Sequence, residues 1–213
     1  MPMNINDPRV VRTKTNLRRA LVDLMKHEDL SSISVQKITD IAGITRGTFY
    51  LHFKDKADFM EKTTQSILDE FFDDTIYKTV VDGQQCEVLN LERAFRYIES
   101  DAEVWEVFLD SEKHVTFYDE FYGRVAEYLT NYFNAVNIDH RKPKVPLPLQ
   151  ISFNASAFLG VIQRWLDDDM IYTSRYMNKS VEQLFGNLNV NDISVSNFFL
   201  PHEPIADDGV GEE

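Results

Sequence analysis

The amino-acid sequence predicts an all-α protein with a small N-terminal helical head and a larger helical body. Apolar residues recur at spacings of three and four along most of the chain, which is the periodicity of helices that pack on one face. The sustained alternation of apolar and polar residues that marks strands is missing. Gly and Pro interrupt the pattern at intervals, and 43% of the residues are hydrophobic, which is enough for a packed core.

The first helix is predicted to begin at Pro8 and to run to about Glu28. Asp7 precedes it as an N-cap, and Pro is favoured at the first helical position because its missing N–H would have no partner there. The residues expected to form its buried stripe are Leu17, Ala20, Leu21, Leu24 and Met25.

Two short helices and a longer one are predicted next. Ser34 caps the second helix, which ends at Gly43 because glycine readily adopts the left-handed conformation that ends a helix. A third helix begins after Thr45 and ends near Phe53, and a fourth begins at Asp55. The residues expected to bury the second helix are Val35, Ile38 and Ile41, and those expected to bury the third are Phe49 and Phe53.

The body is predicted to be helical and to end in an irregular tail. Pro143, Pro146 and Pro148 indicate a loop from 137 to 148. From about Asn189 the chain is rich in Asp, Glu, Gly and Asn, and we expect its last ten residues or so to be disordered. The body helices are expected near 87–99, 102–110, 116–136, 148–169 and 175–188.

Charge divides the 213-residue chain in two. Residues 1–56 carry 10 Lys and Arg against 6 Asp and Glu, a net charge of +4, whereas residues 57–213 carry 12 against 29, a net charge of −17. A basic head attracts phosphates and an acidic body is repelled by them, which favours one orientation on a nucleic acid. A chance cluster of surface lysines is the alternative, because +4 is a modest charge.

The second and third helices, with the tight turn between them, form a helix-turn-helix pattern. The third helix carries short, polar or flat residues on the face opposite its buried phenylalanines. Such a face suits a DNA major groove, whereas an ordinary solvated face would carry bulky charged side chains. The alternative is a small packed bundle with Tyr50 and His52 at its rim or in its core. The outward residues are Gly47, Thr48, Tyr50 and Leu51.

Each predicted DNA contact follows from the chemistry of its side chain. Arg46 can pair with a guanine edge or a phosphate, Thr48 can reach a base edge, and Leu51 can contact a thymine methyl group. Tyr50 can donate its hydroxyl to a phosphate. The other predicted contacts are Thr45, which caps the third helix, Gln36, for a base or a phosphate, and Lys54 and Lys56, for the DNA backbone.

One set of positions in this segment follows a recognisable pattern: Ile38, Ala42, Gly43, Ile44, Gly47, Thr48, Phe49, Tyr50, His52, Phe53, Lys54 and Lys56. The pattern resembles the DNA-binding head of the TetR family of transcriptional regulators. The resemblance covers roughly residues 9–60, about a quarter of the chain. It departs from the family at Thr39, where the family usually has Ala.

The resemblance implies a homodimer whose two heads read a palindrome in double-stranded DNA, and a divergent body that binds a small-molecule effector. Residues 158–170, followed by Ser174, also resemble a subgroup that includes regulators of dihydroxyacetone kinase operons in Gram-positive bacteria. The implied base contacts are Thr45, Arg46, Gly47 and Thr48, and the implied phosphate contacts are Tyr50 and Lys56. The predicted domains are a helix-turn-helix DNA-binding domain (1–56), a helical effector-binding and dimerisation domain (57–190) and an acidic, flexible tail (191–213).

Two further sites are predicted in the body. Aromatic residues are dense there and could line an apolar ligand pocket, with ordinary core packing as the alternative. Ser152, Ser156 and Gly160 recur every four residues, with Leu159 beside them, so that another helix can approach closely. That helix belongs either to a second subunit or to the same one. The candidate pocket residues are Trp105, Phe108, Phe121, Tyr122, Tyr128, Phe153 and Trp165.

Other chemistry is not indicated by the sequence. With Cys86 as the single cysteine, no intrachain disulfide can form, which fits a reducing cytoplasm. We expect no leader and no membrane span, because no apolar run approaches 18 residues. The histidines are scattered, and phosphate-loop and nucleophile motifs are missing, so we expect no metal, no cofactor and no enzymatic activity.

The function predicted from these patterns is that of a dimeric repressor whose third helix enters the major groove of a palindromic operator. An effector bound to the body would favour a conformation that releases DNA, with the fourth helix as the link between head and body. Two alternatives stay open. One is an activator that works with a partner protein, and the other is a helical protein-interaction module without DNA binding.

Overall fold

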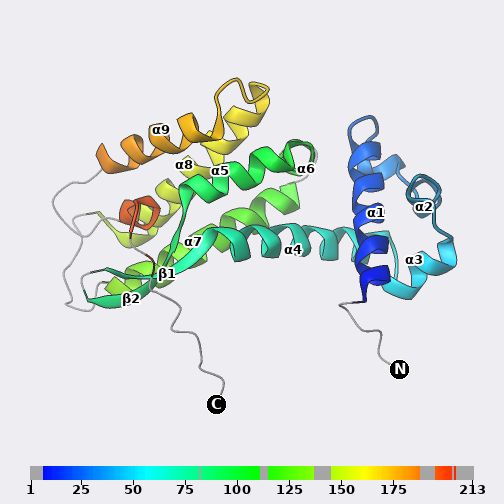
Figure 1. Ribbon diagram of the computed structural model, residues 1–213, viewed down its shortest axis with the longest axis horizontal. Coiled ribbons are helices and arrows are strands. Elements are labelled where there is room, and N and C mark those ends of the chain that lie inside the picture. The colour runs from blue at the N-terminus through cyan, green and yellow to red at the C-terminus, as the bar shows by residue number, and fades with distance from the viewer. Residues whose placement is uncertain are drawn as a thin grey trace, which may run out of the picture. The chain divides into compact units, whose positions relative to one another are not determined.

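The computed structural model describes residues 7–81, 83–110, 115–136, 145–187, 195–202 and 204, and Figure 1 shows its elements. The chain forms two compact units. The first comprises residues 1–69 and 103–117, and the second comprises residues 70–102 and 118–213. Helices make up most of the described chain, which confirms the predicted all-α class, with one short hairpin as the exception.

The first unit begins with the predicted first helix, α1 (Pro8–Met25). The Asp7 carboxylate accepts a hydrogen bond from the Arg9 backbone N–H at 2.8 Å, which confirms the predicted cap. The helix ends three residues earlier than expected, at Met25. Every residue of the predicted stripe is buried: Leu17, Ala20, Leu21, Leu24 and Met25.

The helix-turn-helix consists of α2 (Val35–Ala42) and α3 (Arg46–His52). The Ser34 hydroxyl accepts from the Lys37 N–H at 3.2 Å, and α2 ends at Gly43 with φ 67°. Because this left-handed conformation is strained for any side chain with a Cβ, glycine is required at the turn. A single 3-10 turn, η1 (Leu30–Ser32), precedes α2 and was not predicted.

Aromatic rings hold the third helix in place. Phe49, Phe53 and Phe59 are all buried, with ring centroids 5.5 Å apart for Phe49–Phe59 and 4.7 Å for Phe53–Phe59. The predicted burial of Phe49 and Phe53 is therefore confirmed. The predicted burial of Ile41 is wrong, because half of that residue is exposed at the last turn of α2. Ile38 is the fully buried apolar residue of that helix.

Helix α4 (Lys56–Thr75) belongs to both units, since the division falls between Asp69 and Glu70. The Asp55 carboxylate accepts from the Asp58 N–H at 2.9 Å, as predicted for its cap. The first unit also contains α6 (Ala102–Phe108), whose Trp105 is buried.

The second unit contains an antiparallel hairpin that was not predicted. Strand β1 (Ile76–Val81) follows α4 directly and pairs with β2 (Gln84–Leu89), with Gly83 at φ 79° in the turn. The predicted start of a helix near residue 87 is therefore wrong. The helix α5 (Leu91–Ser100) begins only after Asn90, whose side chain accepts from the Arg93 N–H at 2.9 Å.

The rest of the second unit is helical. It comprises α7 (Val115–Val136, from residue 118), α8 (Leu147–Asp167) and α9 (Ser174–Asn187), and α5 and α9 lie side by side in Figure 1. The Glu99 carboxylate of α5 accepts from both the Ser174 N–H, at 3.1 Å, and the Ser174 hydroxyl, at 2.7 Å. The start of α9 is therefore capped by a side chain of α5. None of the described helices is long and apolar enough to cross a bilayer.

Part of the predicted tail is integral to this unit. A second 3-10 turn, η2 (Val195–Phe199), buries Phe198 and Phe199 in the core, so the expectation of a flexible tail is wrong for residues 195–202. The physical reason is the burial of these two large rings, which stabilises an ordered segment. Of the last ten residues only Pro204 is described, and most of the predicted loop, 137–144, also lies outside the described residues.

Candidate nucleic-acid interface

Helix α3 presents its predicted outward face to solvent. Phe49 is fully buried, whereas Leu51 is 70% exposed and Tyr50 is 48% exposed. Arg46 and Gly47 are exposed and Thr48 is partly exposed. Large apolar and aromatic side chains are seldom left this accessible on one turn of a helix without a binding partner.

The N-terminal turn of this helix is fixed by its own side chains. The Thr45 hydroxyl accepts from the Thr48 N–H at 3.1 Å, and the two threonine hydroxyls lie 2.9 Å apart. Arg46 donates from Nη2 to the Tyr50 hydroxyl at 3.4 Å, and its guanidinium lies 5.8 Å from the centre of that ring. Because both partners are exposed, this contact can give way to a stronger one with a phosphate at small cost.

Gln36 and Lys54 lie at the edges of this surface. Gln36 is exposed on the first turn of α2 and donates to the Asp40 carboxylate at 2.6 Å. The Lys54 side chain is exposed, while its backbone N–H donates to Asp58 at 2.8 Å. That hydrogen bond, followed by one from Lys62, lowers the pKa of the Asp58 carboxyl.

Lys56 differs from the other predicted contacts. It is partly buried, and its ammonium donates to the backbone carbonyl oxygens of Leu30 and Ile33, each at 2.8 Å. Two of its three N–H donors are therefore engaged inside the head, where the sequence had indicated a phosphate.

His52 lies partly exposed at the end of α3. Partial burial is the main cause that lowers the pKa of its imidazole, and the positive charge of Lys14 lowers the pKa further. His52 therefore favours the neutral form and adds little to the positive charge of the head near neutral pH.

The predicted pocket residues are divided between the two units. Trp105 and Phe108 belong to the first unit and the other five to the second. Phe121 and Trp165 are buried, whereas Phe153 is 56% exposed on α8. Tyr122 and Tyr128 are partly exposed.

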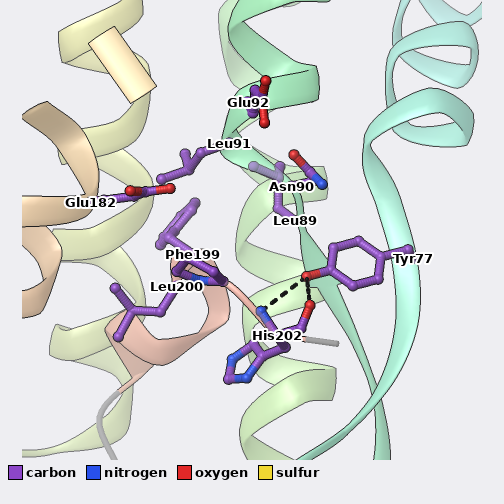
Figure 2. A pocket seen from close by; sticks show the side chains of 10 residues that line it. Tyr77, Leu89, Asn90, Leu91, Glu92, Glu182, Phe199, Leu200 and His202 are labelled. Atoms are coloured by element: carbon purple, nitrogen blue, oxygen red, sulfur yellow. Dashed lines mark hydrogen bonds between the residues drawn. The ribbon is translucent and has the colours of Figure 1, made fainter. Parts of the chain in front are cut away.

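A cavity of about 110 Å³ lies elsewhere in the second unit. Its walls come from β1, the end of β2, the start of α5, α9, the end of η2 and the segment that follows it, and Figure 2 shows their side chains. They include Tyr77, Glu92, Glu182, Phe199 and His202, none of which the sequence had indicated. The walls come from a hairpin and a tail that were not expected to be ordered together.

The predicted small-residue ridge is on the surface of α8. Ser152, Ser156 and Gly160 are exposed, and a Cβ added at Gly160 would meet no atom within 4 Å. Leu159 is fully buried and points into its own subunit, so its predicted place in an interface between subunits is wrong. Ser152 also accepts a hydrogen bond from the Tyr122 hydroxyl at 3.0 Å.

Two family descriptions match the chain. "Bacterial regulatory proteins, tetR family" matches residues 17–63, and "Transcriptional regulator C-terminal region" matches residues 89–187. Together they cover about two thirds of the sequence. The chain belongs to the TetR family of bacterial transcriptional regulators. The first match spans α2 and α3, so the exposed face of α3 lies in the helix-turn-helix of a TetR-family protein.

A curated relative of this TetR-family regulator is the "Uncharacterized HTH-type transcriptional regulator YxbF" of Bacillus subtilis (strain 168), which is 34% identical over 68 residues. The alignment covers 32% of this chain and 18% of the relative, so the chain spans less than a fifth of that relative's length.

Solved structures show the same fold at low sequence identity. "Dihydroxyacetone kinase operon activator DhaS" has a TM-score of 0.55 at 16% identity, covering 84% of this chain and 97% of its own. NalD of Pseudomonas aeruginosa, described as the secondary repressor of the MexAB-OprM multidrug efflux pump, has a TM-score of 0.59 at 17% identity, covering 85% and 100%. At these identities the likenesses show the fold alone.

Proposed function

We propose that this TetR-family regulator is a ligand-responsive homodimeric repressor of the bacterial cytoplasm. Each subunit would place α3 in the major groove of one half of a palindromic operator. The two heads would lie one helical turn of DNA apart, about 34–36 Å. A bound effector would stabilise a conformation with another spacing and so release the operator.

The exposed face of α3 is the single observation that carries the proposal. Phe49 anchors the helix from behind, so Arg46, Tyr50 and Leu51 stand on a rigid support. A guanidinium, a phenol hydroxyl and an apolar side chain are groups that read base edges, phosphates and thymine methyl groups. Placing such groups on a rigid element favours sequence-specific recognition over a merely electrostatic contact.

Exposed residues of α8 and α9 support the homodimer. On α8, Gly160 and its two serines leave room for a close approach, and Leu149 and Phe153 are exposed large apolar residues of the same helix. On α9, Tyr176 and Leu184 are exposed too. Large apolar side chains on a surface indicate contact with a further surface.

Helix α4 is the proposed link between the effector and the operator. Its first turn is tied to the head by Lys56, and its last residue, Thr75, accepts from the Asn90 N–H at 2.8 Å in the second unit. A ligand changes DNA affinity only if it binds the two conformations with different affinity. Because α4 is hydrogen-bonded at both ends, a shift caused by the effector at one end can change the position of the other end.

The test is the salt dependence of binding to duplex DNA. An operator is first selected from random duplexes with the full-length protein, and the affinity is then measured as the salt concentration rises. Affinity should fall steeply, with a logarithmic slope of about 0.9 for each phosphate neutralised. Failure to retain any duplex at low salt would contradict the proposal and favour a protein-interaction module.

An activator is the second candidate, and the fold shared with DhaS, which is described as an operon activator, is the observation that favours it. A reporter gene behind the selected operator separates the two possibilities. Deleting the regulator should raise reporter expression if it is a repressor and lower it if it is an activator.

A further inference from the structure

We propose that the cavity beside the hairpin is an effector site for a small aliphatic amine. This inference rests on the proposed function, because it names the ligand class and the place from which DNA binding is regulated. The cavity lies wholly within the second unit.

The charge of the walls selects a cation. Among the described residues that line the cavity, the charged side chains are Glu92 on α5 and Glu182 on α9, and none is Lys or Arg. Glu182 forms no hydrogen bond or ion pair with the residues that the structure describes, whereas Glu92 pairs with Arg96 one turn further along α5. Figure 2 shows Glu182 facing Leu91 of the neighbouring helix. An ammonium group at Glu182 would meet a carboxylate that none of the described residues pairs with.

The remaining walls favour an organic cation with a short alkyl chain. Leu91, Leu200 and the ring of Phe199 are apolar, and Tyr77 and Phe199 add aromatic rings that attract cations. The volume of about 110 Å³ is smaller than the ~150 Å³ cavity that holds benzene, so only a few non-hydrogen atoms fit. A primary amine with about four carbons matches both the size and the chemistry.

The walls are held together by hydrogen bonds that do not involve the Glu182 carboxylate. The Tyr77 hydroxyl donates to the His202 carbonyl oxygen at 3.1 Å, which holds the C-terminal segment against β1, as Figure 2 shows. The His202 imidazole bonds to the Asn197 carbonyl oxygen at 2.9 Å. The Tyr77 hydroxyl and the His202 imidazole are therefore both engaged in hydrogen bonds to the C-terminal segment.

The position of the cavity connects it to α4. Tyr77 lies two residues after Thr75, the last residue of that helix, and the Asn90 N–H donates to the Thr75 carbonyl oxygen at 2.8 Å. Arg93 donates to the Asp74 carbonyl oxygen at 3.0 Å. The C-terminal end of α4 is therefore bonded to residues that line the cavity or lie next to it, so a ligand that shifts α5 or β1 also shifts α4.

Calorimetric titration of n-butylamine into the full-length protein tests the site. We expect saturable binding by n-butylamine and none by 1-butanol, which has nearly the same shape without the charge. Glu182→Gln should weaken amine binding about tenfold or more, because it removes a charged hydrogen-bond partner. Glu127→Gln, the same change on the exposed surface of α7, should leave it unchanged. Equal binding of amine and alcohol, or an undiminished affinity in Glu182→Gln, would overturn the inference.

The link to regulation is tested with the selected operator. Saturating n-butylamine should change the affinity of the wild-type protein for the operator at least fivefold and leave that of Glu182→Gln unchanged. An unchanged wild-type affinity overturns the effector role. Operator binding without amine is measured separately, so a protein that binds DNA and ignores amines refutes only this inference, whereas one that binds no DNA refutes the proposed function.

Discussion

The Lys56 ammonium donates to the Ile33 carbonyl oxygen at 2.8 Å, which joins the first turn of α4 to the residue just before the cap of α2. A second hydrogen bond, to the Leu30 carbonyl oxygen, has the same length. These bonds connect segments 23 and 26 residues apart in the sequence. Lys56 therefore stabilises the head. Its hydrogen bonds also connect α4 directly to the segment that precedes the helix-turn-helix.

The first prediction separates Lys56 from Lys54. Lys56→Met should lower the free energy of unfolding by about 1–3 kcal/mol, because two partly buried carbonyl oxygens lose a charged donor. It should weaken DNA binding without changing the logarithmic slope of affinity against salt concentration. Lys54→Met, the matched change of an exposed lysine, should leave stability unchanged and reduce the slope by about 0.9. A smaller dependence of DNA affinity on salt concentration in Lys56→Met would instead support the phosphate contact that the sequence predicts for Lys56.

The second prediction concerns the division of roles on α3. Thr48→Val keeps the shape of the side chain but removes the hydroxyl, so discrimination at one base pair of the operator should fall by about 1–3 kcal/mol. Tyr50→Phe removes a hydroxyl that donates to a phosphate. It should therefore weaken binding to every sequence by about the same factor. Competition between the selected operator and its single-base variants measures both effects. The same pattern of loss in the two variants would show that the assigned roles are wrong.

The head could be predicted from the sequence because its signals are local. Asp7, Ser34 and Thr45 each cap the helix that directly follows, and Gly43 ends α2 where its conformation requires glycine. Each of the three caps acts over only two or three residues. The prediction failed at Ile41, where Thr39 rather than Ile41 is buried beside Ile38.

The cavity could not be predicted because its walls come from segments far apart in the sequence. Tyr77 and His202 are 125 residues apart and meet through a hydrogen bond that no periodicity reveals. The strands are six residues each, with irregular burial, so the alternation expected of strands is weak. Phe198 and Phe199 were the available signal in the tail, since adjacent aromatic rings seldom stay in solvent.

The third prediction locates the dimer interface with two glycines. Gly160→Trp on α8 and Gly123→Trp on α7 each place a large ring where an added Cβ meets no atom of the same subunit within 4 Å. Both variants should therefore fold as the wild type does. We expect only Gly160→Trp to weaken the dimer, as measured by sedimentation equilibrium over a range of concentrations. If Gly123→Trp weakens the dimer and Gly160→Trp does not, the interface lies on α7 and the assignment to α8 is wrong.

The fourth prediction is a pH dependence that arises from His52. Partial burial, followed by the charge of Lys14, lowers the pKa of this imidazole from the ordinary value of 6.5, so the folded protein takes up a proton less readily than the unfolded chain. The unfolded chain binds more protons between the two pKa values, and stability therefore falls as the pH drops from above 6.5 through the lower pKa of the folded state.

Urea unfolding at a series of pH values measures this effect. His52→Gln should flatten the decline in stability between pH 7 and the acidic end of that range, because the group that resists protonation is gone. Lys14→Met should reduce the decline in part, since burial, the larger cause, stays in place. His27→Gln, a change at an exposed histidine of the same unit, serves as the control and should follow the wild type. An equally steep decline in His52→Gln would show that protonation of His52 is not its cause.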